Sequence, residues 1–355
     1  MKIMSVVGAR PQFVKLAPIA HACARAGVDH IVVHTGQHYD PMLSDVFFDD
    51  LNIPAPQEHL GIGSGTHGRQ TGAMLAAMDE VVEKHAPDWM LVYGDTNSTL
   101  AAALSAVKLH IPTAHLEAGL RSFNRMMPEE INRVLTDHAA DLLLAPTEVA
   151  REHLRTEGLA ERTVVVGDVM TDVLFHTRDL VAGQSSPISE EFGFPKGEYF
   201  VATIHRPANT DSPQRLEQVL DALGALPHPV AILAHPRLVA KAEEFGLPIG
   251  RGNLHVHSPL AYPQLVASVD QAKGVITDSG GLQKEAFLLR TPCTTVRPET
   301  EWVETVEYGW NVLVEPGPAL IEAAMRPRPD DVDATPYGDG HAADRVVETL
   351  IRNAR

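Results

Sequence analysis

Residues 92–133 read VYGDTNSTLAAALSAVKLHIPTAHLEAGLRSFNRMMPEEINR, and this stretch contains the pattern that decides the fold. Asp95 and Glu117 each follow an apolar segment that predicts a buried strand, and Glu129 and Glu130 stand where a helix is expected to begin. In an open α/β sheet, ligands bind at the carboxyl ends of the strands. Because these acids fall at the ends of elements, we expect acid/base chemistry on a bound ligand.

Length, charge and cysteine content restrict the class of protein. A chain of 355 residues predicts about two domains. A net charge of −17 without a basic run argues against a nucleic-acid-binding protein and against a protein of the membrane surface. Cys23 and Cys293 lie far apart without metal-ligand spacing, which fits a reducing cytosol and predicts a cytoplasmic protein. We expect neither a signal peptide nor a transmembrane helix.

The apolar segments of the first half alternate with helical patterns, which predicts a doubly wound parallel sheet. Strands are expected at residues 3–7, 30–35, 89–93, 112–116, 142–145 and 164–167. Helices are expected at residues 13–26, 38–51, 69–85, 99–109 and 129–139. These elements predict a first domain of residues 1–168.

The second half repeats this alternation after a polar stretch. Residues 183–197 are rich in Gly, Ser and Pro and indicate a linker or an early loop of a second domain. Strands are then expected at residues 199–204, 229–234, 254–258, 274–277 and 293–296, and a final helix at residues 341–355. We therefore predict a second domain of residues 169–340. The expected fold class is α/β, with two Rossmann-like doubly wound domains facing across a cleft that binds the ligand.

Two turns between a strand and a helix are candidates for anion binding. The first, GARP at residues 8–11, lacks a G-x-G-x-x-G fingerprint. Arg10 and Lys15 would add positive charge there, but a surface turn with two solvated cations is the simpler interpretation. The second, TDSGG at residues 277–281, lets backbone N–H groups surround a phosphate, and Glu285 could hold ribose hydroxyls. A glycine-rich turn with an Asp or Ser N-cap is the alternative.

Each of the three acids also has a structural interpretation. Asp95 could cap the following helix, although residues 96–98 could do so equally well. Glu117 ends an apolar strand and caps nothing evident. Glu129 suits the dipole of a helix N-terminus and stands four residues before Arg133, so the two could form a surface ion pair. The catalytic interpretation depends on the three acids occurring together at ligand-facing ends.

His205 and Arg206 follow the first predicted strand of the second domain. A single histidine is more often structural than catalytic, but a strand end beside an arginine favours a functional role. His34 and His38 have i,i+4 spacing without a third ligand, so we predict no zinc site. The sequence contains neither a G-x-S-x-G elbow nor a Cys/His nucleophile pattern.

Nine motifs span nearly the whole chain: GARPQFVKLAPI, HTGQHYD, GSGTHG, YGDTNSTLA, HLEAGLRSFNRMMPEEINRVLTDH, TIHR, TDSGGLQKEA, TEWVETVEYGWN and PYGDG. With them the chain resembles the non-hydrolysing UDP-N-acetylglucosamine 2-epimerase family, in the branch that includes UDP-2,3-diacetamido-2,3-dideoxyglucuronate 2-epimerases. The resemblance implies two domains arranged as in GT-B glycosyltransferases, a final helix that crosses back to the first domain, and a homodimer.

The resemblance also implies a reaction and the residues that perform it. UDP leaves C1 as the C2 proton is removed, and it then adds back with a proton delivered to the opposite face, which turns UDP-GlcNAc into UDP-ManNAc without metal or redox cofactor. Asp95, Glu117 and Glu129 are the implied acid/base residues, and His205 would serve the diphosphate or the sugar hydroxyls. The implied substrate-binding residues are Arg10, Lys15, Gln37, Arg133, Arg206, His235, Ser279, Gly280, Gly281 and Glu285.

Two positions depart from the family pattern. Ala208 stands where relatives commonly carry Glu after the His-Arg pair. Asp40 and Pro41 stand near the place where some members use a second glutamine for an allosteric substrate molecule, so we expect no substrate activation of that type.

Other functions remain open at this point. The substrate could be a UDP-2,3-diacetamido-glucuronate, and the product could serve a cell-envelope polysaccharide or a secondary metabolite. A hydrolysing epimerase would release free ManNAc and UDP. A GT-B glycosyltransferase would transfer sugar only to an acceptor, and a binding protein would hold UDP without turnover.

Overall fold

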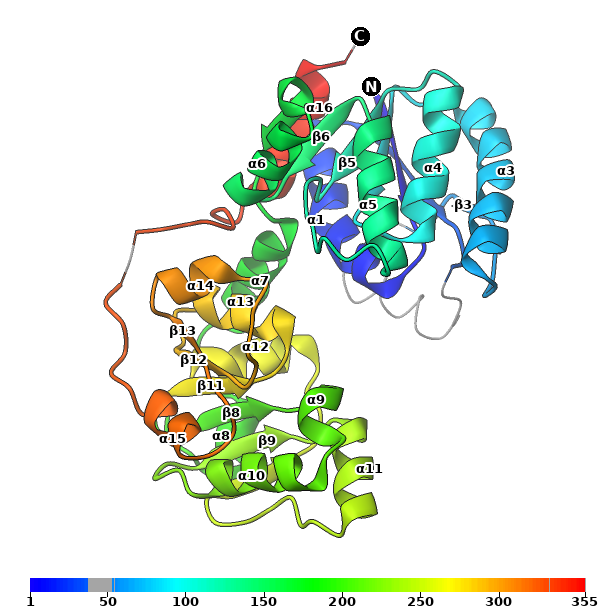
Figure 1. Ribbon diagram of the computed structural model, residues 1–355. Helices are drawn as coiled ribbons and strands as arrows, with labels where there is room; N and C mark the ends of the chain where they lie inside the picture. The colour runs from blue at the N-terminus through cyan, green and yellow to red at the C-terminus, as the bar shows by residue number, and fades with distance from the viewer. Residues whose placement is uncertain (38–52, 54, 332, 355) are drawn as a thin grey trace. The chain divides into compact units, whose positions relative to one another are not determined.

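The computed structural model describes residues 1–37, 53, 55–331 and 333–354. For Arg10 it describes the backbone but not the side chain. The chain divides into two compact units, one of Met1–Val173 with Thr335–Arg355 and the other of Leu174–Ala334 (Figure 1). The helix expected at residues 38–51 and the positions Asp40 and Pro41 lie outside the described residues.

In its described part, the first unit contains a parallel sheet in the order β3-β2-β1-β4-β5-β6-β7. The strands are β1 (Lys2–Val7), β2 (Asp29–His34), β3 (Glu58–His59), β4 (Trp89–Tyr93), β5 (Thr113–Leu116), β6 (Leu142–Ala145) and β7 (Thr163–Val165). The helices are α1 (Arg10–Ala26), α3 (His67–His85), α4 (Asn97–Lys108), α5 (Pro128–Ala139), α6 (Glu148–Thr156), the 3-10 turn Ala160–Arg162 and α16 (Ala342–Arg352). The strand order reverses at β1 and β4, so their carboxyl ends form the topological switch point.

The second unit repeats this arrangement with a parallel sheet in the order β10-β9-β8-β11-β12-β13. Its strands are β8 (Phe200–Thr203), β9 (Val230–Leu233), β10 (Leu254–His257), β11 (Gly274–Thr277), β12 (Cys293–Thr295) and β13 (Asn311–Leu313). Its helices are α8 (Pro187–Phe192), α9 (Pro207–Thr210), α10 (Pro213–Gly224), α11 (Pro236–Phe245), α12 (Tyr262–Asp270), α13 (Gly280–Leu288), α14 (Val303–Glu307) and α15 (Pro318–Ala324). Helix α7 (Val169–Leu180) leads from the first unit into the second. Here the switch point lies at β8 and β11.

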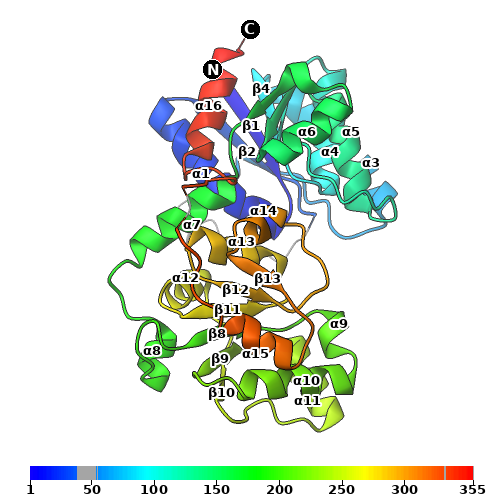
Figure 2. The same ribbon diagram turned by 60° about the vertical axis from the view of Figure 1, so that its left-hand side comes forward.

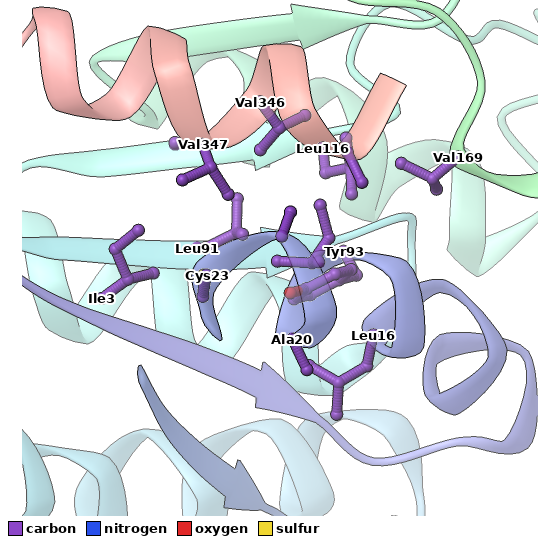
Figure 3. Packing of buried hydrophobic residues seen from close by; sticks show 14 of the residues in the cluster. Ile3, Leu16, Ala20, Cys23, Leu91, Tyr93, Leu116, Val169, Val346 and Val347 are labelled. Carbon is purple, nitrogen blue, oxygen red and sulfur yellow. The ribbon is translucent and has the colours of Figure 1, made fainter. Parts of the chain in front are cut away.

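The strand β4 is buried on both faces, as its continuous apolar sequence WMLVY predicts. Leu91 and Tyr93 pack into the hydrophobic cluster that includes α1 and α16 (Figure 3). Met90 and Val92 point the other way, into the cluster of α3 and α4. The period of two along an extended chain therefore divides one strand between two hydrophobic layers, which fixes the register of its carboxyl end at Gly94.

The C-terminal helix α16 is part of the first unit and lies beside α1 in both views (Figures 1 and 2). Val346 and Val347 belong to the same cluster as Leu91. The indole Nε1 of Trp89 donates a hydrogen bond to the carbonyl of Leu350 at 3.1 Å. Apolar burial and this long-range hydrogen bond attach the end of the chain to the first sheet.

The α/β fold class, with two Rossmann-like units of the GT-B kind, is confirmed. Several short elements were missed in the sequence: α6 begins at the N-cap Thr147, and α8 lies inside the expected linker with Pro187 in its first turn. The first helix begins at Arg10 instead of residue 13, because Pro11 occupies the helix start where proline is tolerated. Of the described helices, none has the length and apolar character needed to cross a bilayer.

Candidate active site

Two of the three acids follow neighbouring strands next to the first switch point, Asp95 after β4 and Glu117 after β5. Asp95 follows Gly94, which has a left-handed φ of 63°, and Glu117 itself has a φ of 69°. That conformation is uncommon for a residue with a Cβ and costs on the order of 1 kcal/mol or more. A Cβ added to Gly94 would lie 3.2 Å from Oε2 of Glu117. The absence of a side chain at residue 94 therefore leaves room for the carboxylate of Glu117.

Glu117 forms an ion pair with Lys15, which reaches it from α1. The two side chains are only 11% and 16% exposed. Burial alone would lower the pKa of Lys15, but the charge and hydrogen bond of Glu117, with smaller contributions from Asp168 and Asp95, hold that pKa above its ordinary value. The site therefore carries a fixed positive charge beside a carboxylate.

Asp95 is held by Arg133 of α5, whose Nη2 lies 2.6 Å from its Oδ2. The same guanidinium contacts Glu130 at 2.7 Å. Glu130 is buried and accepts hydrogen bonds from the backbone N–H groups of Ser122 and Phe123, each at 2.9 Å. Although burial raises its pKa, these donors and Arg133 hold the pKa of Glu130 below its ordinary value. Arg133 thus links a buried structural carboxylate to the more exposed Asp95.

Glu129 does not form the surface ion pair with Arg133 that its spacing allowed, because Arg133 turns toward Asp95 and Glu130. Instead Glu129 and Asp95 line one cavity of about 340 Å³. Gln37 lines it too, and its Oε1 accepts hydrogen bonds from the N–H and hydroxyl of Ser98 at 3.0 and 2.7 Å. Glu117 and Lys15 are absent from the lining of this cavity.

Amide side chains that sequence reasoning missed complete the cavity wall. Nδ2 of Asn132 donates to the carbonyl of Asp95 at 2.9 Å and to Oδ1 of Asn97 at 3.2 Å. Asn97 in turn donates to Oε1 of Gln70 at 2.8 Å. The position of Asn132 beside Arg133 in α5 was the signal available in the sequence. These amides offer both donors and acceptors to a polar ligand.

At the second switch point, Asp278 at the end of β11 organises the turn after β8. Its carboxylate accepts from the N–H groups of His205 and Arg206 at 3.0 and 2.9 Å and from Nδ2 of Asn209 at 3.0 Å. It also lies 3.1 Å from Nδ1 of His205. Burial opposes ionisation, but these hydrogen bonds hold the pKa of Asp278 below its ordinary value. The sequence indicates Asp278 only as a possible N-cap, because its partners lie about 70 residues earlier.

His235 lies next to His205, with ring centroids 5.1 Å apart. It is the N-cap of α11, and its Nδ1 accepts a hydrogen bond from the N–H of Arg237 at 3.1 Å. Burial and the neighbouring His205 lower its pKa. The sequence placed both histidines among the site residues, and the structure brings them together.

The turn TDSGG begins α13, with Ser279 as an N-cap residue whose side chain makes no capping hydrogen bond. A Cβ added to Gly280 would collide with the carboxylate of Glu301, while one added to Gly281 would meet only open space. Glu301 also lies 2.9 Å from Arg297 and 3.9 Å from Arg206. A carboxylate therefore occupies the N-terminus of α13 between two guanidinium groups, a position suited to a phosphate.

Glu285 lies in the second turn of α13 and is partly buried. Burial raises its pKa to about 7. Of the remaining predicted site residues, Arg10 begins α1, but its side chain is not described. Within the described ranges there is no cluster of three or more His, Cys, Asp or Glu residues that could hold a metal ion.

Strand-end carboxylates in one Rossmann-like unit and an anion position in the other are features expected of an α/β enzyme that acts on a phosphorylated ligand, such as a nucleotide sugar. The family described as UDP-N-acetylglucosamine 2-epimerase matches residues 21–351. The chain therefore belongs to this family of isomerases.

Two relatives share 44% of their residues with this chain. One, from Methanococcus maripaludis, is named a UDP-N-acetylglucosamine 2-epimerase homolog, and the match covers 99% of both chains. The other is the UDP-2,3-diacetamido-2,3-dideoxy-D-glucuronate 2-epimerase of Pseudomonas aeruginosa, and the match covers 99% of this chain and 100% of that one.

Solved structures of the UDP-GlcNAc 2-epimerase of Methanocaldococcus jannaschii are also similar. The first has a TM-score of 0.89 at 37% identity and covers 99% of this chain and 100% of that one. The second is a complex with UDP-GlcNAc and UDP, with a TM-score of 0.79 at 38% identity and the same coverage.

Proposed function

We propose that this enzyme inverts C2 of a UDP-2-acetamido sugar and interconverts UDP-GlcNAc and UDP-ManNAc. The observation that supports this most is the group of carboxylates Asp95, Glu117 and Glu129 around the first switch point, each in a different environment. An inversion at carbon needs one group that removes a proton and another that returns it from the opposite face.

The reaction proceeds in two balanced steps. A carboxylate takes the proton from C2, the electrons of the C2–H bond form a C1=C2 double bond, and the C1–O bond breaks with its electrons leaving on UDP. This gives 2-acetamidoglucal and free UDP in the site. In the second step an oxygen of UDP bonds to C1, and C2 receives a proton on the other face.

Asp95, Glu117 and Glu129 are the acid/base groups in this proposal. The cavity supports roles for Asp95 and Glu129 at the sugar, because both line it together with amides able to bind hydroxyl and acetamido groups. The fixed charge of Lys15 and the guanidinium of Arg133 stabilise negative charge that develops in the transition state. Gln37, which lines the same cavity, and Arg10 also bind substrate in this proposal.

The second unit binds UDP in this proposal. Ser279, Gly280 and Gly281 hold phosphate at the N-terminus of α13, and Arg206 lies nearby; Glu285 accepts hydrogen bonds from ribose hydroxyls. The carboxylate of Glu301 stands in for a phosphate oxygen at that helix end. His205 contacts the diphosphate or a sugar hydroxyl, and its ring is oriented by Asp278 and His235.

Solvent exchange tests the proposed mechanism. Incubation with UDP-GlcNAc in D2O should place deuterium at C2 of both epimers, as read by proton NMR. Epimerisation without deuterium at C2 would overturn the elimination mechanism. Continuous accumulation of free UDP with ManNAc would instead identify a hydrolysing epimerase, and sugar transfer that requires an acceptor would identify a glycosyltransferase.

A second substrate is favoured by one specific observation: the Pseudomonas aeruginosa relative, at 44% identity, is named for a 2,3-diacetamido glucuronate. Rates measured by NMR on UDP-GlcNAc and on the UDP-linked 2,3-diacetamido uronic acid, under equal conditions, decide between them. A kcat/KM at least tenfold higher for one of the two compounds identifies that compound as the preferred substrate.

We also propose that the enzyme is a cytoplasmic homodimer. Large apolar side chains are exposed on α5 and on the loop before it, with Met126 90% and Phe123 74% exposed, and a second copy of the chain could cover them. Sedimentation equilibrium should give twice the monomer mass, and Met126→Lys should lower the association constant. A monomer at all concentrations would contradict the dimer.

A further inference from the structure

His115 occupies an unusual position in β5, two residues before Glu117. Its side chain is fully buried, so it touches neither solvent nor the cavity lined by Asp95. Nδ1 lies 2.6 Å from Oδ1 of Asp137 in α5, and Nε2 lies 2.7 Å from the carbonyl oxygen of Gly94. Both partners are hydrogen-bond acceptors. Both ring nitrogens must therefore donate, which requires the doubly protonated imidazolium form.

Asp137 is equipped to balance this charge. Its Oδ2 accepts from the N–H of Gly119 at 3.1 Å and lies 2.7 Å from Nη1 of Arg121. Burial opposes its ionisation, but His115 and Arg121 hold the pKa of Asp137 below its ordinary value. An ionised Asp137 cannot donate a proton to the ring, so the proton on Nδ1 belongs to His115.

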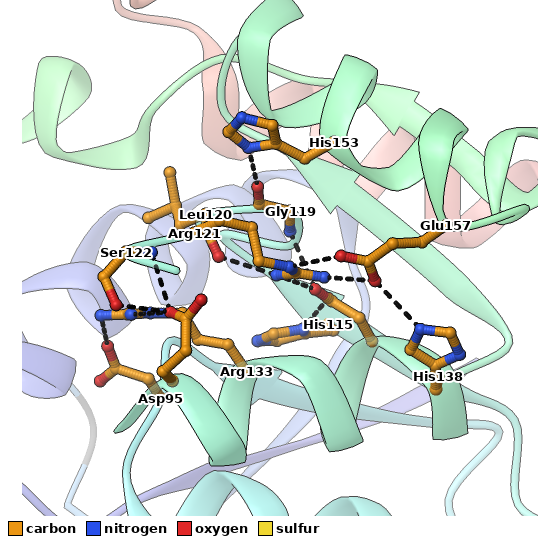
Figure 4. A network of polar contacts seen from close by, with 12 residues as sticks. Asp95, His115, Gly119, Leu120, Arg121, Ser122, Arg133, His138, His153 and Glu157 are labelled. Carbon is orange, nitrogen blue, oxygen red and sulfur yellow. Dashed lines mark hydrogen bonds and ion pairs between the residues drawn. The ribbon is translucent and has the colours of Figure 1, made fainter. Parts of the chain in front are cut away.

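The charged groups that contact this pair form one connected network that ends at the surface. Arg121 makes two further contacts with Glu157, at 2.7 and 2.9 Å, and Glu157 lies 3.0 Å from His138 at the exposed end (Figure 4). The cations His115 and Arg121 are thus matched by the anions Asp137 and Glu157. A matched network of this kind can keep a buried imidazolium without a net charge in the core.

The network contacts the backbone next to Asp95 and close to Glu117. His115 fixes the carbonyl of Gly94, the residue before Asp95, and Asp137 fixes the N–H of Gly119, two residues after Glu117. Gly94 and Gly119 have left-handed φ angles of 63° and 82°, and Glu117 between them is left-handed too. The two glycines adopt this conformation without a steric penalty, but at Glu117 the intrinsic preference is against it, so the backbone there needs external restraint.

We infer that His115 is a positioning residue that donates from both ring nitrogens and, with Asp137, holds the main chain carrying Asp95 and Glu117. The assignment of a catalytic purpose to this restraint rests on the proposed function. His115 touches no reacting atom; it acts through the peptide groups of Gly94 and Gly119. A shift of about 1 Å in a catalytic group costs about 10²-fold in rate, so loss of the restraint should appear in kcat.

The protonation state is tested directly in the unaltered enzyme. Nitrogen NMR of protein with 15N-labelled histidine rings, with His115→Gln used to assign the signal, should show one ring with protons on both nitrogens at neutral pH. These N–H protons should exchange slowly with solvent because the ring is buried. A ring at residue 115 with one bare nitrogen would overturn the inference.

Turnover tests the positioning role. His115→Gln and Asp137→Asn should lower kcat and C2 deuterium incorporation about 10²-fold, while KM and the affinity for UDP stay unchanged. His138→Gln changes the exposed end of the same network and is the matched control, expected to keep wild-type kcat. A folded His115→Gln with wild-type kcat would overturn the positioning role. Lack of C2 inversion by the wild type on any UDP-acetamido sugar would overturn the proposed function instead.

Discussion

The ammonium group of Lys15 and the carboxylate of Glu117 form an ion pair between α1 and the left-handed residue after β5. The sequence separates these residues by 102 positions. The pair is largely shielded from water, and the pKa of Lys15 is held above its ordinary value mainly by Glu117, against the effect of burial. Each of the two largely buried charges is therefore stabilised by the other.

Lys15→Met should leave the carboxylate of Glu117 without its counter-ion. We expect a loss of about 2 kcal/mol in the free energy of unfolding, measured by urea denaturation, and a fall in kcat of at least about 10²-fold. Lys15→Arg keeps the charge and is the control; it should recover most of the stability. Equal stability of Lys15→Met and wild type would show that the ion pair contributes nothing to the folded state.

Asp95→Asn, Glu117→Gln and Glu129→Gln should each lower kcat by about 10²–10⁴-fold, because a positioned acid or base contributes that much to proton transfer. Stopped samples analysed by NMR for the two epimers give the rates. Glu80→Gln, at an exposed position of α3, is the control and should be neutral. Any acid whose replacement leaves kcat within a few-fold of wild type is not an acid/base group.

The strand-end positions of Asp95, Glu117 and the turn TDSGG could be predicted because each follows an apolar segment, and the parallel strands within one sheet place their carboxyl ends at one edge. The roles that could not be predicted depend on contacts between distant parts of the chain. The role of Asp278 requires Asn209 and the turn at His205, and no spacing rule connects them.

The same reason explains the residues overlooked in the fold. The helix α8 was hidden because Ser, Pro and Glu in a short polar stretch fit a linker as well as a capped helix. His115 is one of many histidines in the chain, and nothing in the sequence distinguishes it. Its role can be recognised only from its contact with Asp137 of the following helix, α5.

Glu301→Gln should raise the affinity for UDP. The carboxylate of Glu301 lies at the N-terminus of α13 beside Arg297, so it would compete with a phosphate for the space and the positive charge at that helix end. Isothermal titration should show a Kd for UDP that is several-fold lower than in the wild type, with a steeper salt dependence. Glu299→Gln removes an exposed charge close in sequence and is the control for the change in net charge. An unchanged or weaker affinity for UDP in Glu301→Gln would contradict the competition.

Burial raises the pKa of Glu285 from its ordinary value of 4.5 to about 7. Between these values the carboxyl is protonated in the folded enzyme and ionised in the unfolded chain, so the folded state binds the extra proton. The free energy of unfolding that Glu285 contributes is therefore fully present below about pH 4.5. It falls as the pH rises from there to about 7, and it does not change further above that pH. Glu285→Gln should remove this slope from the free energy of unfolding.

The affinity for UDP should rise with pH, whereas the stability contributed by Glu285 falls, because ribose hydroxyls donate hydrogen bonds to the ionised form of Glu285. We expect UDP to bind more tightly as the pH rises through about 7, by about tenfold for each unit by which UDP lowers the pKa of this carboxyl. The terminal phosphate of UDP titrates near 6, so titration calorimetry must compare the wild type with Glu285→Gln, which retains that phosphate step. If the two affinities rise in parallel between about pH 6 and 8, Glu285 does not contact the ribose as a carboxylate.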